Sequence, residues 1–206
     1  MSLYSGIYHA NGNPKLGPKV GVTNRMPGLA TAGGTCPGAS TWCAGAGKCY
    51  ALKGRYRMHH GRYQADAIAW PAPGQDADLH RIHTAGDFDT VEYIAATIQL
   101  ANANPQTAYW AYTRSWRIPE LLPALEELRA LANVELFAST DLSIAETPPA
   151  GWRIAAIEGD PRYPGPVCME QRKDRKGNPE RGHKANCRAC GYCWRGKSKN
   201  IIFRFH

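Results

Sequence analysis

The chain has 206 residues, a formal net charge of +8 and a hydrophobic fraction of 43%, which fit one globular domain with a small appendage. No apolar run approaches the length of a membrane span, and the first residues lack the basic and apolar regions of a secretory signal. We therefore expect a cytoplasmic protein with no membrane partner. The positive charge favours an anionic partner such as a nucleotide, a nucleic acid or a phosphorylated substrate, and ordinary solvation of a basic surface explains it equally well.

A loop at residues 35 to 51, rich in glycine, proline and alanine, carries Cys36, Cys43 and Cys49 and runs into a helix that we expect to begin at Tyr50. Small residues let the backbone fold closely around an inorganic centre. A structural zinc site needs four protein ligands, whereas three thiolates leave one position of a metal or cluster open. The loop therefore predicts an active-site metal centre held by these three cysteines.

A basic segment follows at residues 53 to 63, in which lysine, arginine and histidine alternate with tyrosine. The alternation suits contact with phosphates and stacked bases. A solvated helix face that ends at Gly61 explains the pattern slightly better. The segment is therefore compatible with a nucleic-acid partner without requiring one.

Apolar strands and amphipathic helices alternate from about residue 80 to residue 157. This alternation implies right-handed crossovers and an α/β fold with a parallel sheet or barrel. The expected strands lie at residues 19–22, 81–84, 107–112, 134–138 and 152–157, with a last strand in the tail of residues 194–206. The expected helices are one capped by Asp89, with Val91, Ile94, Ala95, Ile98 and Ala101 on its inner face, and one from Pro119, with Leu121, Leu122, Leu125, Leu128 and Leu131 inside.

Polar residues follow the apolar strands at their carboxyl ends, which is where parallel folds bind ligands. Loops are polar because they meet water, and this explains about half of these residues. Their recurrence after four strands still indicates a site. The residues are Gly86-Asp87, Arg114-Ser115, Ser139-Thr140-Asp141 and Glu158-Gly159-Asp160.

A second cysteine group, Cys168, Cys187, Cys190 and Cys193, lies in a polar, basic segment that has too few apolar residues for a core of its own. Its short intervals predict a metal centre, which the segment needs in order to fold. Zinc and a [4Fe–4S] cluster both suit four cysteines, and the two successive two-residue intervals favour the cluster. His183 could replace one cysteine, although a solvated loop histidine explains this residue better. The chain thus divides into a partial barrel at residues 1–160, carrying the three-cysteine loop, and a four-cysteine extension at residues 161–206.

Because the cysteines divide into three and four on a chain of alternating strands and helices, the sequence resembles the radical S-adenosylmethionine enzymes. More narrowly, it resembles the phage gene product 88 family over about residues 30 to 200. The motifs that carry the narrower resemblance are Cys36-Pro37-Gly38-Ala39-Ser40, Cys49-Tyr50-Ala51, Gly86-Asp87-Phe88, Tyr112-Thr113-Arg114-Ser115-Trp116, Ser139-Thr140-Asp141 and Cys190-Gly191-Tyr192-Cys193-Trp194.

The broader resemblance implies a partial (β/α) barrel with a [4Fe–4S] cluster on the loop after the first strand, S-adenosylmethionine on the open iron and an external electron donor. Mapped onto this chain, the cluster ligands are Cys36, Cys43 and Cys49. The expected contacts to S-adenosylmethionine come from Ala85, Gly86, Asp87, Ser139, Thr140, Asp141 and Tyr50. Asp87, Arg114 and Asp141 are the expected catalytic residues, and Arg114 is also suited to a carboxylate or phosphate.

Three functions remain open from the sequence. The first is a radical S-adenosylmethionine enzyme that modifies a nucleotide or a nucleic-acid base in phage and has an auxiliary centre at its C-terminus. The second is a nucleic-acid-binding module with zinc at both cysteine groups. The third is an iron–sulfur enzyme that does not use S-adenosylmethionine. The third is suggested by the wide cysteine spacing and by Tyr50, which follows Cys49 where the radical enzymes place an aromatic residue before it.

Overall fold

The computed structural model describes residues 7–10, 15–45, 47–53, 78–171, 186–196 and 199–204. A seven-stranded sheet forms the centre, and its strands follow one another in chain order. The strands are β1 (Ile7–Ala10), β2 (Val20–Arg25), β3 (Leu79–Ile82), β4 (Ala108–Thr113), β5 (Val134–Ser139), β6 (Arg153–Ile157) and β7 (Ile201–Phe203). β1 is antiparallel to β2, and each later pair is parallel. The predicted α/β fold with parallel strands is confirmed, and the described sheet is open because β1 and β7 form its two edges.

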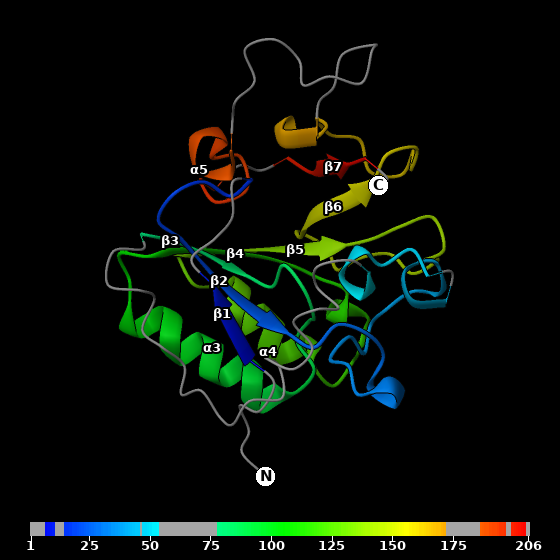
Figure 1. The fold of residues 1–206 in the computed structure, drawn as a ribbon, viewed down its shortest axis with the longest axis horizontal. Helices are drawn as coiled ribbons and strands as arrows, with labels where there is room; N and C mark the ends of the chain where they lie inside the picture. The colour runs from blue at the N-terminus through cyan, green and yellow to red at the C-terminus, as the bar shows by residue number, and fades with distance from the viewer. Residues whose placement is uncertain are drawn as a thin grey trace.

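Two helices, α3 (Val91–Ala103) and α4 (Leu122–Arg129), cover one face of the sheet (Figure 1). Alternate strand residues point at them, because successive side chains of a strand face opposite sides. Tyr109 and Leu136 from the strands are buried there with Ile94 and Leu125 from the helices. This apolar layer is the main core of the chain.

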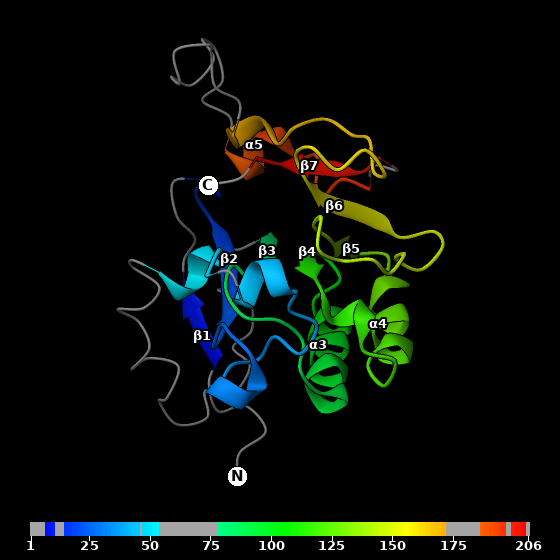
Figure 2. The same cartoon turned by 90° about the vertical axis from the view of Figure 1, so that its right-hand side faces the viewer.

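The opposite face, called here the inner face, is covered by the C-terminal segment that carries α5 (Cys187–Cys190) (Figures 1 and 2). The other set of alternating strand residues points this way. Trp110 and Phe137 are fully buried on this face, beneath residues of the C-terminal segment. The cysteine-rich part of the chain is therefore packed on the sheet.

The cap and the inner face of α3 differ from the prediction. Thr90 is the N-cap, and its hydroxyl accepts the amide of Tyr93 at 3.1 Å. Asp89 instead pairs with Arg25, with 3.0 Å between the guanidinium nitrogen and the carboxylate oxygen. The predicted inner residue Val91 is 44% exposed, and Ala95 is also exposed. The buried side of the helix consists of the predicted Ile94, Ile98 and Ala101 together with Tyr93, Ala96, Thr97 and Leu100.

Other elements begin or end a few residues away from their predicted positions. β3 begins at Leu79, two residues before the predicted strand, and α4 begins at Leu122, after Pro119. The helix expected from Tyr50 is a single 3₁₀ turn, Tyr50–Leu52. β1 and α5 were not predicted. The basic segment from residue 54 onward and His183 lie outside the described residues.

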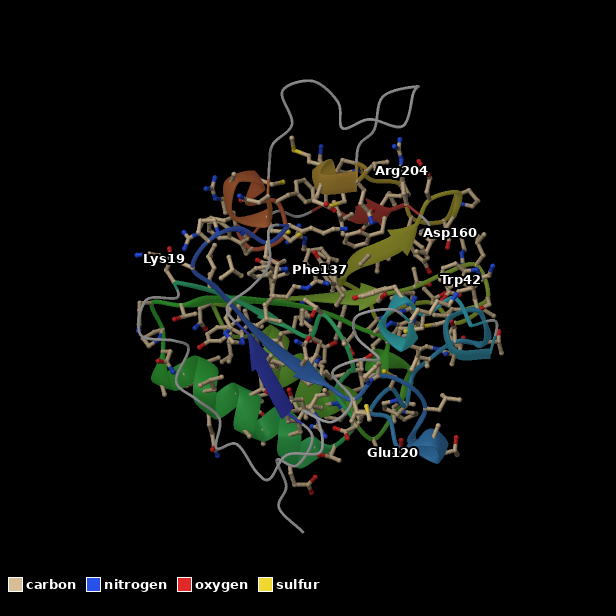
Figure 3. The ribbon with its side chains drawn as sticks, viewed as in Figure 1. Lys19, Trp42, Glu120, Phe137, Asp160 and Arg204 are labelled. Carbon is tan, nitrogen blue, oxygen red and sulfur yellow. The ribbon has the colours of Figure 1, made fainter. Side chains whose placement is uncertain are left out.

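The carboxyl ends of the parallel strands all lie at the same end of the sheet. Trp42 of the cysteine loop and Asp160, which follows β6, lie toward this end, whereas Lys19, which precedes β2, lies at the opposite end (Figure 3). The loops after the strands are therefore brought together as the alternation predicted. Within the described part of the chain, the helices are too short or too polar for any of them to cross a bilayer.

Candidate functional site

The cysteine loop leaves β2 and packs on the end of β4. The amide of Cys36 donates to the carbonyl of Gly28 at 2.9 Å, which closes the first turn of the loop. A Cβ atom added to Gly38 would lie 2.0 Å from the carbonyl oxygen of Arg114. Because only a residue without a side chain allows this approach, Gly38 fixes the distance between the loop and the strand end.

The three cysteines of the loop are half-buried free thiols that interact with one another. The amide of Cys49 donates to the carbonyl of Cys43 at 3.0 Å, and the two thiols are also hydrogen-bonded. Cys36 lies within electrostatic range of both. In the residues that the structure describes, no three Cys, His, Asp or Glu side chains already form a metal-binding group. Coordination would therefore require the sulfurs to turn from their hydrogen-bonded positions toward a common centre.

Local charges act strongly on these thiols. Burial, followed by the negative charge of Asp87, raises the pKa of Cys36 to about 12. The hydrogen bond from Cys43 lowers the pKa of Cys49 below the usual thiol value and raises that of Cys43. The guanidinium of Arg114 acts to lower the pKa of all three, although burial and the neighbouring groups keep the pKa of Cys36 and Cys43 above the usual thiol value. Because the thiolate is the metal-binding form, Arg114 favours the ligating state of the loop.

A chain of polar contacts connects the loop to the ends of β4 and β5. The carboxylate of Asp141, which follows β5, accepts hydrogen bonds from Arg114 at 3.1 Å and from the hydroxyl of Ser40 at 2.6 Å. Ser40 in turn accepts the amide of Cys43 at 3.1 Å. Burial acts to raise the pKa of Asp141, but the hydrogen bonds from Ser40 and Ser143 and the charge of Arg114 outweigh it and hold this pKa below its usual range. Asp141 thus orients Arg114 and anchors the loop at the same time.

Asp87 connects the ends of β3 and β4. Its carboxylate accepts the hydroxyl of Thr113 at 2.6 Å, the amide of Phe88 at 2.8 Å and the amide of Arg114 at 2.8 Å. Burial raises its pKa to about 6, although these hydrogen bonds act in the opposite direction. With three donors at its oxygens and a negative charge that reaches Cys36, Asp87 positions the strand ends beside the loop.

Ala85 and Gly86 hold the ends of β2 and β3 together. The carbonyl of Ala85 accepts the amide of Arg25 at 2.9 Å, and a Cβ atom on Gly86, where φ is +79°, would lie 2.5 Å from the Cβ of Arg25. The side-chain oxygen of Asn24 accepts the amides of Thr84 and Ala85 at 2.9 and 3.0 Å. Sequence reasoning missed Asn24 because it ended the first parallel strand at residue 22, although the polar Asn24 follows the same strand-end pattern as the predicted residues.

Near the loop, two polar atoms of the described residues are buried without a hydrogen-bond partner. The hydroxyl of Thr140 is fully buried and, within the described residues, has no hydrogen-bond partner; the same holds for Nε of Arg114. The carbonyl of Ser139 accepts the indole N–H of Trp116 at 3.1 Å. Tyr50 is 50% exposed, so its ring is accessible beside Cys49. Since buried polar groups are nearly always paired in native proteins, Thr140 and Arg114 point to a missing partner.

The polar residues after β6 take part in separate ion pairs. The carboxylate of Asp160 accepts the guanidinium of Arg162 at 2.7 Å, and Glu158 pairs with Arg204 at 3.3 Å. Each of these two carboxylates is paired with an arginine that follows it in the chain, so neither needs a ligand to balance its charge.

The four C-terminal cysteines are free thiols that lie within electrostatic range of one another, although in the described residues their side chains do not already form a metal-binding group. Electrostatic interactions join Cys187 to Cys168 and Cys190, and join Cys193 to Cys168 and Cys187. The hydroxyl of Tyr112, on the inner face of β4, is hydrogen-bonded to Cys193. Cysteines separated by up to 25 positions therefore share one region of the inner face.

Comparison with known proteins gives the family. A family model described as Gene product 88 matches residues 8–196. Two curated relatives are both named Gene 88 protein. The one from Mycobacterium phage L5 is 27% identical over 218 residues, which cover 89% of this chain and 87% of that protein. The one from Mycobacterium phage D29 is 25% identical over 217 residues, which cover 89% of this chain and 88% of that protein. No solved structure is significantly similar. Because the family model spans most of the chain, this protein belongs to the gene product 88 family of phage proteins.

Proposed function

We propose that the chain is an iron–sulfur enzyme of the radical S-adenosylmethionine type, in which Cys36, Cys43 and Cys49 hold a [4Fe–4S] cluster. The observation that carries the proposal is the grouping of three interacting loop thiols beside Arg114 at the carboxyl ends of parallel strands. Six parallel strands in chain order, with the loop directly after the first of them, agree with the partial (β/α) barrel of such enzymes.

The donor set and the space around it fit a cluster with one open iron. Three thiolates from one loop leave the fourth position free, which a closed zinc site would not. A Cβ atom added to Gly47 would meet nothing within 4 Å, so the loop between Cys43 and Cys49 borders open space. Arg114 supplies positive charge beside the three sulfurs, which favours thiolates over thiols.

Such a cluster, when bound, supplies the electron that cleaves S-adenosylmethionine into methionine and a 5′-deoxyadenosyl radical, which takes a hydrogen atom from the substrate. The contribution of this chain is to bind and orient. Nε of Arg114 is suited to the methionine carboxylate, and the hydroxyls of Ser139 and Thr140 to the ribose. The exposed ring of Tyr50 is suited to stacking on adenine. Asp87 and Asp141 fix the strand ends and the Arg114 side chain that these contacts require.

The substrate that we propose is a nucleotide or a base in nucleic acid. A net charge of +8 attracts phosphates, and the described sheet is open, which leaves room for a large substrate. An external electron donor would complete the set of partners.

The test is product formation with a reconstituted chain. The protein is purified anaerobically, its iron and sulfide are counted, and dithionite and S-adenosylmethionine are added before chromatography for 5′-deoxyadenosine. We expect the nucleoside from wild type, none from Cys43→Ala, and undiminished formation per loop cluster from Cys190→Ala. Iron without the nucleoside would refute the use of S-adenosylmethionine and favour an iron–sulfur enzyme of another type. Zinc without iron would refute the cluster and favour the nucleic-acid-binding module.

A further inference from the structure

The C-terminal cysteines are held in place by backbone contacts that involve no metal. The amide of Cys187 donates to the carbonyl of Lys15 at 2.9 Å, and the amide of Cys168 donates to the carbonyl of Ile202 at 2.8 Å. The side chain of Asn186 caps α5 by accepting the amide of Ala189 at 2.9 Å. These bonds tie the N-terminal segment, the crossover after β6 and β7 to one place above the inner face.

Apolar side chains of the sheet pack against three of the four cysteines. Cys187 and Cys193 pack against the cluster that contains Leu79 and Trp110, and Cys168 and Cys193 pack against the cluster that contains Phe137. The indole N–H of Trp110 is buried and, among the described residues, has no hydrogen-bond partner. The surroundings therefore suit an enclosed centre, whereas the N-terminal cysteine loop borders open space.

Arg81 is a partly buried charged residue on the inner face of β3. Among the described ion pairs none includes Arg81, and its assigned hydrogen bond runs from Nε to the carbonyl of His83 at 3.2 Å. The guanidinium stands over the ring of Tyr112, 4.9 Å from the ring centroid. The charges nearest to it are those that Cys187, Cys193, Tyr50 and Tyr112 can carry.

A neutral thiol cannot balance Arg81, whereas a metal-bound thiolate can. Four thiolates around Zn²⁺ carry a net charge of −2, and a [4Fe–4S]²⁺ cluster with four thiolates carries the same charge. A partly buried cation without a counter-charge is costly, so its presence beside four cysteines points to an anionic centre. The hydroxyl of Tyr112, which is hydrogen-bonded to Cys193, supplies a donor to one of the sulfurs.

We propose that Cys168, Cys187, Cys190 and Cys193 form a closed four-thiolate metal centre on the inner face of the sheet, and that Arg81 is its counter-charge. Loading this centre releases the thiol protons and joins the crossover after β6 to α5 through the metal. Arg81 is a positioning residue, because its charge acts on the metal through Cys187 and Cys193, which lie within electrostatic range of it. The proposal does not depend on the activity proposed for the N-terminal loop.

The first experiment isolates this centre in a full-length variant in which Cys36, Cys43 and Cys49 are all alanine. Zinc and iron per chain are measured by mass spectrometry, and X-ray absorption at the metal edge reports the ligands. We expect retained metal with four sulfur neighbours at about 2.3 Å, as in four-cysteine sites. Adding Cys190→Ser should remove that metal. A folded triple variant without bound metal would overturn the proposal, as would mixed nitrogen and oxygen ligation. If the triple variant does not fold, the comparison of wild type with Cys190→Ser decides, since equal metal content in these two would also overturn it.

The second experiment tests Arg81 by the rate at which metal is lost to a chelator. Arg81→Met should lose the C-terminal metal about tenfold faster or more, as expected when a group that supports metal ligands is removed. Arg81→Lys should keep nearly the wild-type rate because it keeps the charge. Arg129→Met is the matched control, since Arg129 pairs with Glu126 on α4, on the other face of the sheet. Wild-type rates in both Arg81 variants would refute the role of Arg81.

Discussion

Replacement of Asp141 by asparagine should loosen the cysteine loop without altering its sequence. The Asp141 side chain is 1% exposed and accepts hydrogen bonds from Ser40 at 2.6 Å, from the Ser143 hydroxyl at 2.7 Å and from Arg114 at 3.1 Å. Hydrogen bonds that involve a charged group contribute about 1.5–3 kcal/mol each, and an asparagine keeps one acceptor oxygen but no charge. Arg114 is 18% exposed, so water recovers part of its lost pairing. We therefore expect the free energy of unfolding to fall by about 2 kcal/mol.

The same change should expose Cys43 to reagents, because Asp141 holds Ser40 and Ser40 holds the Cys43 amide. Urea unfolding gives the stability, and mass spectrometry after brief iodoacetamide treatment of the metal-stripped chain gives the alkylation rate at each cysteine. Glu135→Gln is the control, since the partly buried Glu135 pairs with Arg153 at 2.7 Å, and Arg153 donates to the carbonyls of Lys199 and Tyr192 rather than to the loop. Both variants should be less stable, and only Asp141→Asn should alkylate Cys43 faster. Unchanged stability and an unchanged Cys43 rate in Asp141→Asn would refute the anchoring role.

Three further changes test the surrounding structure. Gly38→Ala places a Cβ atom 2.0 Å from the Arg114 carbonyl oxygen, so the loop must shift and urea unfolding should show a loss of about 1–3 kcal/mol; a wild-type midpoint would contradict this close approach. Burial, together with the charge of Arg25, holds the pKa of His83 well below its usual value. Below about pH 6.5 the unfolded chain therefore binds a proton that the folded chain does not, and stability should fall by up to about 1.4 kcal/mol per pH unit. His83→Asn, which tolerates the φ of 65° at this position, should show a shallower acid dependence in unfolding measured from pH 7 to pH 5, and an identical slope would rule His83 out. Thr90→Ala removes the cap of α3 and should cost about 1 kcal/mol in the same assay, unless another group accepts the amide of Tyr93.

Strands β4, β5 and β6 could be predicted to within two residues because each is a short apolar run between turn residues. The predicted start of β3 lay two residues too far along the chain, because the second residue of the strand, His80, is polar. It is nonetheless buried, since its ring nitrogen is hydrogen-bonded to the Thr23 hydroxyl at 2.7 Å. The cap of α3 depended on a contact as well, because Arg25 draws Asp89 away from the helix. These errors share one cause: a partner distant in sequence decided the local structure.

The candidate site, like the fold, could be predicted only where its features are local in the sequence. The cysteine spacing and the polar strand ends pointed to the loop, to Asp87 and to Asp141 without any structure, because those features are local. The importance of Arg81 and Asn24 comes from neighbours on other strands and loops, which a single sequence does not reveal. Arg81 carried one local sign, a charged residue inside an otherwise apolar strand, and such residues merit attention in related chains.

The most direct test of the central claim is the electron paramagnetic resonance spectrum of the anaerobically reconstituted, dithionite-reduced chain, recorded with and without S-adenosylmethionine. Cys190→Ser is used so that the loop centre dominates the signal. If three loop thiolates leave one iron open to this ligand, its addition will change the spectrum, and Cys43→Ser will lose the signal. A reduced-cluster spectrum that S-adenosylmethionine leaves unaltered, or one that survives in Cys43→Ser, would contradict the account.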